Sequence, residues 1–320
     1  MEKHTYSIII PAYNEAQSLE ELTAQINNAL QQSKLTAEII YINDGSRAST
    51  RDILDPLASK HQNITASHFS HNCGKAAALH AGIARARGER IITLDADLQD
   101  DPQEIKNLIA KMDEGFDLVT GWKKFRKDPL SKTLPSKIFN HFTNLIAGTK
   151  LHDHNCGIKI ISKSCALQLP LYGDLHRYIP AIAAISGYKV SEIPVNHRQR
   201  KYGRSKYGIM RIFHGFFDII TVYIITRYAS KPMHFFGYIG LFIFGFGFLL
   251  ASYLTYEKFI YAKDIGDRPL LNLATLCMII GVQIGITGIL GELINFNQRN
   301  PSKYYTIHSI THADTHPSLQ

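Results

Sequence analysis

Short apolar runs alternate with helical patterns over residues 1–200. The runs are rich in β-branched residues, as buried strands are, and they cover residues 6–10, 38–42, 64–69, 90–94 and 117–121. Helical patterns lie between them at 18–30, 74–87 and 102–114, and the first is predicted to begin with a capping box at Ser18 and Glu21. Alternating strands and helices predict an α/β fold, with a mostly parallel sheet covered by helices on both faces.

The hydrophobic pattern changes beyond residue 231. Two uncharged runs cover residues 232–256 and 269–291, and each exceeds the ~20 residues that cross a hydrocarbon layer as a helix. Buried core helices are the alternative, but soluble helices rarely stay uncharged on every face over such a length. We therefore predict a two-helix transmembrane anchor over residues 232–298, with spans at about 232–256 and 269–293.

The two ends of the predicted spans differ in charge balance. Arg227 and Lys231 precede the first span, and Arg299 and Lys303 follow the second. The connecting loop 257–268 balances three acids against three bases. The positive-inside rule therefore places both chain termini, including the tail 299–320, on the cytoplasmic side of the cell's inner membrane.

A further apolar stretch precedes the first span. Residues 207–228 are mostly apolar, but Arg211, His214 and Asp218 interrupt them. This pattern predicts an amphipathic helix in the membrane interface within residues 207–231. A core helix of the preceding globular region is the alternative.

Charge and cysteine usage narrow the function classes. The chain has 35 Lys and Arg against 27 Asp and Glu, a formal net charge of +8 that favours an anionic partner such as nucleic acid, a phosphate ligand or acidic lipid. Its 4 cysteines form no C-x-x-C pair, which argues against a disulfide scaffold or a zinc ribbon. His152 and His154 suggest zinc, but without a third soft ligand we expect ordinary polar surface there.

Polar clusters follow the first, second and fourth predicted strands, at residues 11–15, 43–46 and 95–97. Parallel strands of such sheets bind ligands beyond their carboxyl ends, so these clusters should share one crevice. Asp95 and Asp97 could bind a hard divalent cation that bridges to a diphosphate, although an isolated D-x-D is usually a solvated turn. The chain has no P-loop and no G-x-G-x-x-G after a strand, so a diphosphate would be held by metal and basic side chains.

Five segments carry a family resemblance when they are taken together. They are residues 8–15, 42–46, 71–75, 95–102 and 153–159. In this order they resemble glycosyltransferase family 2, and within it the polyprenyl-phosphate branch that includes dolichyl-phosphate mannosyltransferase and bacterial polyprenyl-phosphate glucosyltransferases. The resemblance covers about residues 6–206. It implies a GT-A (Rossmann-like) catalytic domain at 1–206 on the cytoplasmic side, a nucleotide-sugar donor, Mg²⁺ or Mn²⁺, and inversion at the anomeric carbon.

The resemblance also implies roles for individual residues. Those that match nucleotide-binding positions are Pro11, Tyr13, Glu15, Asp44 and Asp95. Those that match the metal and diphosphate site are Asp95, Asp97 and Gln99, and Asp97 is counted among the catalytic residues with Asp153. Many relatives have Asp where this chain has Asn43, so any contribution of that carboxylate to base recognition is reduced here.

The acceptor side is predicted from basic segments. Residues 123–137 carry six Lys and Arg against one acid, for which a patch on anionic lipid is the alternative explanation. Lys132 and Ser136 resemble one acceptor-phosphate pair of the family. Arg200, Ser205 and Lys206 resemble its R-x-x-G-x-S-K segment.

The chemistry of a lipid monophosphate limits the need for a base. Its second pKa is ~6, so it is largely dianionic at neutral pH and requires little deprotonation before it attacks. Asp153 matches the position often regarded as a catalytic base in the family. Because a dianion is already nucleophilic, orientation of the acceptor or of sugar hydroxyls is an equal alternative for Asp153.

The sequence thus predicts a membrane-anchored enzyme that moves one sugar from a nucleotide sugar, UDP-glucose in the first place, to polyprenyl phosphate. GDP-mannose is the alternative donor. A processive polysaccharide synthase is less favoured because the Q-x-x-R-W motif is absent, and a non-catalytic nucleotide-binding protein is less favoured because the metal cluster is intact. The predicted partners are the nucleotide sugar, the lipid and the membrane, without nucleic acid, and a homo-oligomer is left open.

Overall fold

The computed structural model describes residues 5–124, 130–198, 201, 221, 223–224, 228, 231–266 and 268–297, without the side chains of 130–135 and 296–297. The chain forms two compact units, Met1–Thr226 and Arg227–Gln320. Most of the predicted interfacial helix at 207–231 and the whole tail 299–320 therefore lie outside the described residues.

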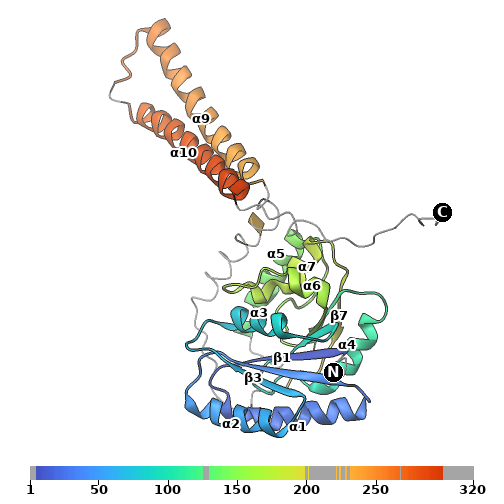
Figure 1. The fold of residues 1–320 in the computed structure, drawn as a ribbon. Coiled ribbons are helices and arrows are strands. Elements are labelled where there is room, and N and C mark those ends of the chain that lie inside the picture. Colours follow the sequence, from blue (N-terminus) through green and yellow to red (C-terminus); the bar gives the residue numbers. More distant parts are fainter. Residues whose placement is uncertain are drawn as a thin grey trace, which may run out of the picture. The chain divides into compact units, whose positions relative to one another are not determined.

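A seven-stranded sheet forms the centre of the first unit, with the order β3-β2-β1-β4-β6-β5-β7 (Figure 1). The strands are β1 (Tyr6–Ala12), β2 (Ala37–Asn43), β3 (Ile64–His68), β4 (Arg90–Thr93), β5 (Leu118–Trp122), β6 (Lys159–Ser162) and β7 (Val190–Pro194). Among the described strands, β6 alone runs against its neighbours β4 and β5, and the other pairs are parallel. The mostly parallel sheet is thus confirmed.

Because β6 is reversed, its first residue lies at the edge where the other strands end. Lys159 pairs with Thr93 of β4 and with Thr120 of β5. The segment before β6, which includes Asp153, therefore reaches the carboxyl edge of the sheet together with the polar clusters that follow β1, β2 and β4.

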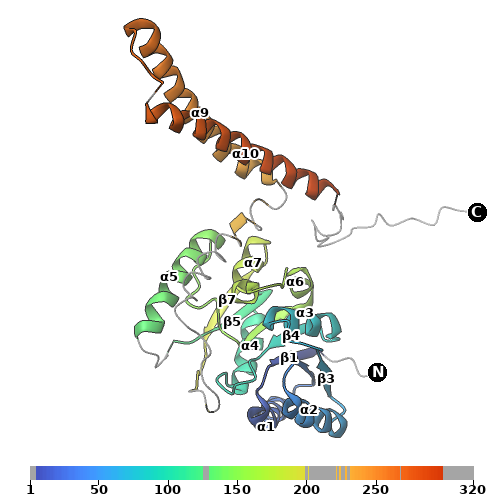
Figure 2. The same ribbon diagram turned by 90° about the vertical axis from the view of Figure 1, so that its left-hand side faces the viewer.

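Helices cover both faces of the sheet (Figures 1 and 2). One face carries α1 (Ala16–Gln32), α2 (Ala48–Lys60), the 3₁₀ turn η1 (Pro102–Glu104) and α4 (Ile105–Met112). The other carries α3 (Lys75–Arg85), α5 (Leu130–Ala147), α6 (Lys163–Gln168), η2 (Leu175–Tyr178) and α7 (Ile179–Ile185). Side chains alternate across a strand, so Ile8 and Ile10 join the first core while Ile9 joins the second.

Two predicted helix starts are wrong in detail. Helix α1 begins at Ala16, so Ser18 is not its cap; the buried Ser18 hydroxyl instead donates to the Glu15 carbonyl at 2.8 Å. The helix expected from residue 102 starts as the 3₁₀ turn η1, which Asp101 caps by accepting from the Gln103 N–H at 3.1 Å. In both cases a polar side chain bonds the backbone within three residues, Ser18 inside the helix and Asp101 as the cap of the 3₁₀ turn.

The second unit is a helical hairpin formed by α9 (Pro232–Tyr261) and α10 (Pro269–Asn297). Both helices are long and apolar enough to cross a membrane, with hydropathies of 2.0 and 2.1. In the most apolar 18-residue stretch of each helix, only 11% and 17% is buried, which argues against the core helices of a soluble protein. Helix α9 runs beyond the predicted 256, and Glu257 in its last turns forms ion pairs with Lys263, at 2.6 Å, and with Arg268 in the connecting loop.

Glycines allow the two helices of the hairpin to approach closely. A Cβ at Gly247 would lie 2.7 Å from the Ala274 carbonyl oxygen, and one at Gly281 would lie 2.6 Å from the Phe244 nitrogen. Small residues are favoured where helices pack backbone to backbone in a membrane.

Candidate active site

The loops after β1 and β2 are joined by hydrogen bonds at the carboxyl edge. Asn14, in a left-handed conformation with φ 57°, donates its N–H to Ser46 Oγ at 2.9 Å and accepts from the Arg47 N–H at 3.0 Å. This fixes the segment that presents the predicted nucleotide-binding residues. Tyr13 is exposed there, and Pro11 and Glu15 are half-buried, so the structure brings these three together at the accessible edge of the sheet.

Asp44 is placed differently from its neighbours in the prediction. Its buried carboxylate accepts from the N–H groups of Cys73, at 2.7 Å, and Gly74, at 3.0 Å, and from Asn72 Nδ2 at 2.9 Å. Asp44 therefore fixes the loop that leads into α3, where the positive end of the helix dipole favours a carboxylate. Its direct contact with a nucleoside stays a prediction.

The loop after β4 exposes alternate residues. Asp95, Asp97 and Gln99 are partly exposed, whereas Ala96 and Leu98 are buried in the core. Leu98 has φ 62°, and the Asp97 carboxylate accepts from the Gln99 N–H at 3.1 Å, which closes a tight turn. A bulky residue in this conformation is strained and is typical of functional loops. The three predicted metal and diphosphate residues thus share one accessible side of the loop.

Lysines surround Asp95. Lys75, the first residue of α3, donates a hydrogen bond to the Asp95 carboxylate. Burial alone would raise the pKa of the Asp95 carboxyl, but Lys75, with contributions from Lys123 and Lys159, brings the pKa well below its usual range. Burial lowers the pKa of Lys159, whose ammonium donates to the Cys156 carbonyl. Anionic charge is therefore strongly stabilised at this position.

Two carboxylates meet above Gly157. A Cβ at this residue would lie 2.2 Å from Asp100 Oδ2 and 2.8 Å from Asp95 Oδ2. The Asp100 Oδ2 atom is buried and has no hydrogen-bond partner in the described part of the chain. Only a glycine fits against this carboxylate pair without displacing it.

The exposed donors fit a divalent cation shared with a substrate. The carboxylates of Asp95 and Asp97 and the amide oxygen of Gln99 are the hard ligands that Mg²⁺ and Mn²⁺ prefer. Within the residues that the structure describes, no group of three or more His, Cys, Asp or Glu is arranged to hold a metal ion by itself. Mg²⁺ is commonly bound by one or two carboxylates together with substrate phosphates, and the donors of Asp95, Asp97 and Gln99 fit such a shared cation.

The segment that follows β7 lies against the loop after β4, which carries Asp95, Asp97 and Gln99. The Arg198 N–H donates to the Gln99 carbonyl at 2.9 Å, and the Arg198 guanidinium pairs with Asp101 at 2.6 Å. Lys201 pairs with Glu21 of α1 at 2.7 Å. The start of the basic acceptor segment is thus held beside the site.

The remaining predicted acceptor residues are only partly covered by the structure. Ser136 is half-buried on α5. Lys132 lies on the same helix, but its side chain is outside the described part, as are Arg200, Ser205 and Lys206 entirely. Their contacts with a phosphate stay predictions.

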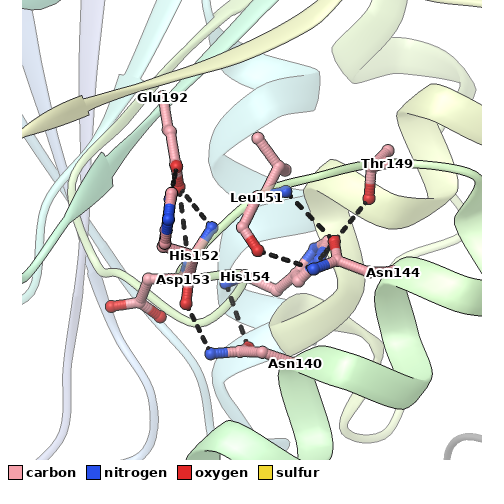
Figure 3. Close-up of polar contacts among 8 residues, drawn as sticks. All are labelled: Asn140, Asn144, Thr149, Leu151, His152, Asp153, His154 and Glu192. Atoms are coloured by element: carbon pink, nitrogen blue, oxygen red, sulfur yellow. Dashed lines mark hydrogen bonds and ion pairs between the residues drawn. The ribbon is translucent and has the colours of Figure 1, made fainter.

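Asp153 lies in the loop before β6, which is held on two sides (Figure 3). Glu192 of β7 accepts from the N–H of His152 at 2.8 Å and from that of Asp153 at 3.3 Å. The His152 ring stacks on Trp122 at 4.1 Å between centroids. His154, expected at the surface, is instead fully buried and bonds Asn144 at 2.9 Å, so that expectation was wrong.

Cys156 is not suited to act as a nucleophile at this edge. Cys156 is buried beside the site, and burial raises its thiol pKa to about 12. The thiol therefore stays protonated at neutral pH and is a poor nucleophile.

Several residues at this edge were not assigned from the sequence. Lys75 and Lys159 lie inside the segments 71–75 and 153–159, which carry the family resemblance. Their position in these segments could have indicated a role at the site. Asn140 and Asn144 are four residues apart, which places them on one face of a helix. The sequence around them does not indicate that this face contacts the loop with Asp153.

Comparisons with known proteins identify the family of the chain. Residues 7–169 match the model of Glycosyl transferase family 2. The chain is 36% identical, over 90% of its length and 87% of the relative, to a dodecaprenyl-phosphate galacturonate synthase of Rhizobium johnstonii. It is 32% identical, over 90% of its length and 86% of the relative, to an undecaprenyl-phosphate 4-deoxy-4-formamido-L-arabinose transferase of Shewanella sediminis.

Solved structures share the fold of the first unit. Glucosyl-3-phosphoglycerate synthase of Mycobacterium tuberculosis, in complex with Mn²⁺, UDP-glucose and phosphoglyceric acid, superposes with a TM-score of 0.55 at 17% identity, over 70% of this chain and 79% of that one. This likeness concerns the fold and supports the predicted GT-A architecture. The family model over residues 7–169 and the relatives above show that the chain belongs to glycosyl transferase family 2.

Proposed function

We propose that this protein transfers a single sugar from a nucleotide-sugar donor to the phosphate of a polyprenyl phosphate, with inversion at the anomeric carbon. The observation that carries the proposal is the accessible row of Asp95, Asp97 and Gln99, flanked by lysines, at the carboxyl edge of the sheet. The two relatives named above transfer sugars to dodecaprenyl and undecaprenyl phosphate by their names, which supports the lipid acceptor.

The reaction is a single displacement. An oxygen of the acceptor phosphate forms a bond to the anomeric carbon, and the bond from that carbon to the nucleoside diphosphate breaks, so the configuration inverts. The acceptor is largely dianionic at neutral pH and needs little help from a base. The main tasks are to align two anions and to stabilise the leaving diphosphate.

The chain's own residues perform these tasks. Lys75 and Lys159 lower the energy of negative charge beside Asp95, where the diphosphate would leave. A divalent cation held by Asp95, Asp97 and Gln99 would neutralise further diphosphate charge. Asp153 orients the acceptor phosphate or the sugar hydroxyls. Because its Oδ1 accepts from the Asn155 N–H at 2.9 Å, one carboxylate oxygen is already fixed.

The donor that we propose first is UDP-glucose, from the resemblance of the nucleotide-binding segments. A uronic acid donor is a second candidate, since one relative is named a galacturonate synthase and three lysines, Lys75, Lys123 and Lys159, act on the charge at Asp95. An additional carboxylate on the sugar would find complementary charge there.

The hairpin of α9 and α10 would hold the enzyme in the cell's inner membrane. Both helices are long enough to span it, and basic residues flank the hairpin at Lys231 and beyond the second helix. With both termini on the cytoplasmic side, the catalytic unit would meet nucleotide sugars in the cytoplasm and lipid phosphate at the membrane surface.

The test is a donor panel. Full-length protein in nanodiscs is supplied with undecaprenyl phosphate, Mn²⁺ and one of UDP-glucose, UDP-galacturonate or GDP-mannose, and lipid products are identified by mass spectrometry. A monoglycosylated lipid phosphate with a UDP sugar, lost in Asp97→Asn, supports the proposal. If product forms only from GDP-mannose, GDP-mannose takes the place of UDP-glucose as the proposed donor. A folded protein that makes no product with any donor would contradict the proposed function.

A further inference from the structure

Helix α5 binds the loop that carries Asp153 through one asparagine side chain (Figure 3). Asn144 Oδ1 accepts from Thr149 Oγ1 at 2.8 Å, from the Leu151 N–H at 3.1 Å and from His154 Nε2 at 2.9 Å. Asn144 Nδ2 donates to the Leu151 carbonyl at 2.7 Å. Both ends of one amide are thus committed to the loop.

A second asparagine extends this contact along the helix. Asn140 lies one turn before Asn144, and residues four apart share a helix face. Its Nδ2 donates to the His152 carbonyl at 2.7 Å, and its Oδ1 accepts from the His154 N–H at 3.4 Å. The backbone on both sides of Asp153 is therefore held by α5.

The Asp153 side chain is left outside these contacts. In Figure 3 its carboxylate points away from Asn140 and Asn144. It is buried, and its Oδ1 accepts from the Asn155 N–H at 2.9 Å, within the same loop. From the other side, Glu192 holds the N–H groups of His152 and Asp153. Such an arrangement fixes the position of a carboxylate without consuming its charge.

His154 contributes to this rigidity as a neutral group. It is fully buried, and burial lowers its pKa to about 4, so the ring is uncharged near neutral pH. Because Asn144 Oδ1 is an acceptor, we assign the ring proton to Nε2. The buried Nδ1 of His154 has no hydrogen-bond partner among the described residues. Among these residues, the bond from Nε2 to Asn144 is therefore the hydrogen bond that orients the imidazole ring.

The same helix carries the predicted acceptor-phosphate contacts. Ser136 precedes Asn140 by one turn, and position 132 precedes Ser136 by another. One end of α5 is thus predicted to meet the lipid phosphate, while the other holds the Asp153 loop.

We propose that Asn144, assisted by Asn140, is a positioning residue that sets Asp153 against the acceptor phosphate, so that α5 links acceptor binding to the placement of this carboxylate. The inference rests on the proposed transfer to a lipid phosphate. It assigns Asn144 a role in the acceptor half of the reaction and none in donor binding.

The experiment compares Asn144→Ala and Asn144→Asp with the control Asn107→Ala. Asn107 lies on α4, and this change removes an exposed hydrogen bond from its side chain to Glu104. For each full-length variant we would measure kcat for transfer, UDP affinity with Mn²⁺ by calorimetry, and the melting temperature. A misplacement of ~1 Å can reduce a rate ~100-fold, so we expect kcat to fall roughly 10- to 100-fold in Asn144→Ala. UDP affinity should stay within about twofold, since the donor side is untouched.

A double-mutant cycle with Asp153→Asn separates positioning from general damage. If Asn144 acts through Asp153, Asn144→Ala should cost little more in the Asp153→Asn background. Asn144→Asp keeps the three acceptor bonds but sets a carboxylate oxygen against the Leu151 carbonyl in place of the donor, so its kcat should fall as well. Equal costs in both backgrounds, wild-type kcat in Asn144→Ala, or a parallel loss of UDP affinity would overturn the inference. An inactive wild-type protein would instead refute the proposed function.

Discussion

Replacing Gly157 by alanine inserts one methyl group between two carboxylates. The added Cβ would lie 2.2 Å from Asp100 Oδ2 and 2.8 Å from Asp95 Oδ2. Ordinary contacts of this kind are ~3.5 Å, so Asp100 Oδ2 must move by roughly 1 Å and Asp95 Oδ2 by somewhat less. Neither neighbour is free to move, because Asp95 is paired with Lys75 and Asp100 is buried.

The expected cost follows from that displacement. Overpacking of this type destabilises a protein by about 1–3 kcal/mol. Moving the proposed cation ligand Asp95 by a large fraction of an ångström should reduce transfer about 100-fold, because catalytic geometry tolerates little error. Part of this loss should appear as weaker Mn²⁺ binding, so that half-maximal activity requires a higher Mn²⁺ concentration.

The assay is the rate of lipid-linked sugar formation across a Mn²⁺ titration. Gly82→Ala is the matched control, because its Cβ would lie 2.4 Å from Ile9 Cγ2, in the core away from the carboxylates. We expect Gly82→Ala to lower the melting temperature but to keep the Mn²⁺ half-saturation of the wild type. If Gly157→Ala transfers sugar at a rate within threefold of wild type, the proposed role of this carboxylate pair is wrong.

Three further predictions address stability. Glu38→Gln weakens the ion pair between buried Glu38 and half-exposed Arg87, at 2.8 Å, at the edge opposite the site, and should lower the melting temperature by about 3–6 °C while sparing kcat; an unchanged melting temperature would contradict this. Since the pKa of His154 is about 4 in the fold and ~6.5 when unfolded, the unfolded chain binds the proton first, so the contribution of His154 to stability should be constant above pH 6.5 and fall by up to ~1.4 kcal/mol per unit towards pH 4. The same slope in His154→Gln, measured by melting against pH, would refute that assignment. Gly281→Leu should separate α9 from α10 and lower the melting temperature in detergent, whereas Gly245→Leu, whose Cβ meets nothing within 4 Å, should not.

The sheet and its carboxyl edge could be predicted because their signals are local. The strands β1 to β5 are short runs rich in β-branched residues, and the polar clusters follow β1, β2 and β4 directly at 11–15, 43–46 and 95–97. The parallel strand β7 (Val190–Pro194) was not predicted. Strand direction then places these clusters together without any knowledge of packing. The two apolar helices are equally local, because length and lack of charge suffice to predict them.

The features that were missed depend on contacts between distant segments. The reversal of β6 brings Lys159 to the carboxyl edge, and a four-residue strand carries no signal for its direction. The commitment of Asp44 to the loop at 72–74 depends on a partner about thirty positions away. His154 looked like surface from its polar neighbours, and only the packing of α5 buries it.

The most direct test of the account is the position of the cation. Crystals of the full-length protein with Mn²⁺ and UDP would be measured at the manganese absorption edge to give an anomalous map. We predict one strong peak in contact with the carboxylates of Asp95 and Asp97 and with the UDP diphosphate, and Lys75 drawn towards the phosphates. Manganese bound elsewhere, or UDP bound with both carboxylates turned away from its diphosphate, would contradict the central claim.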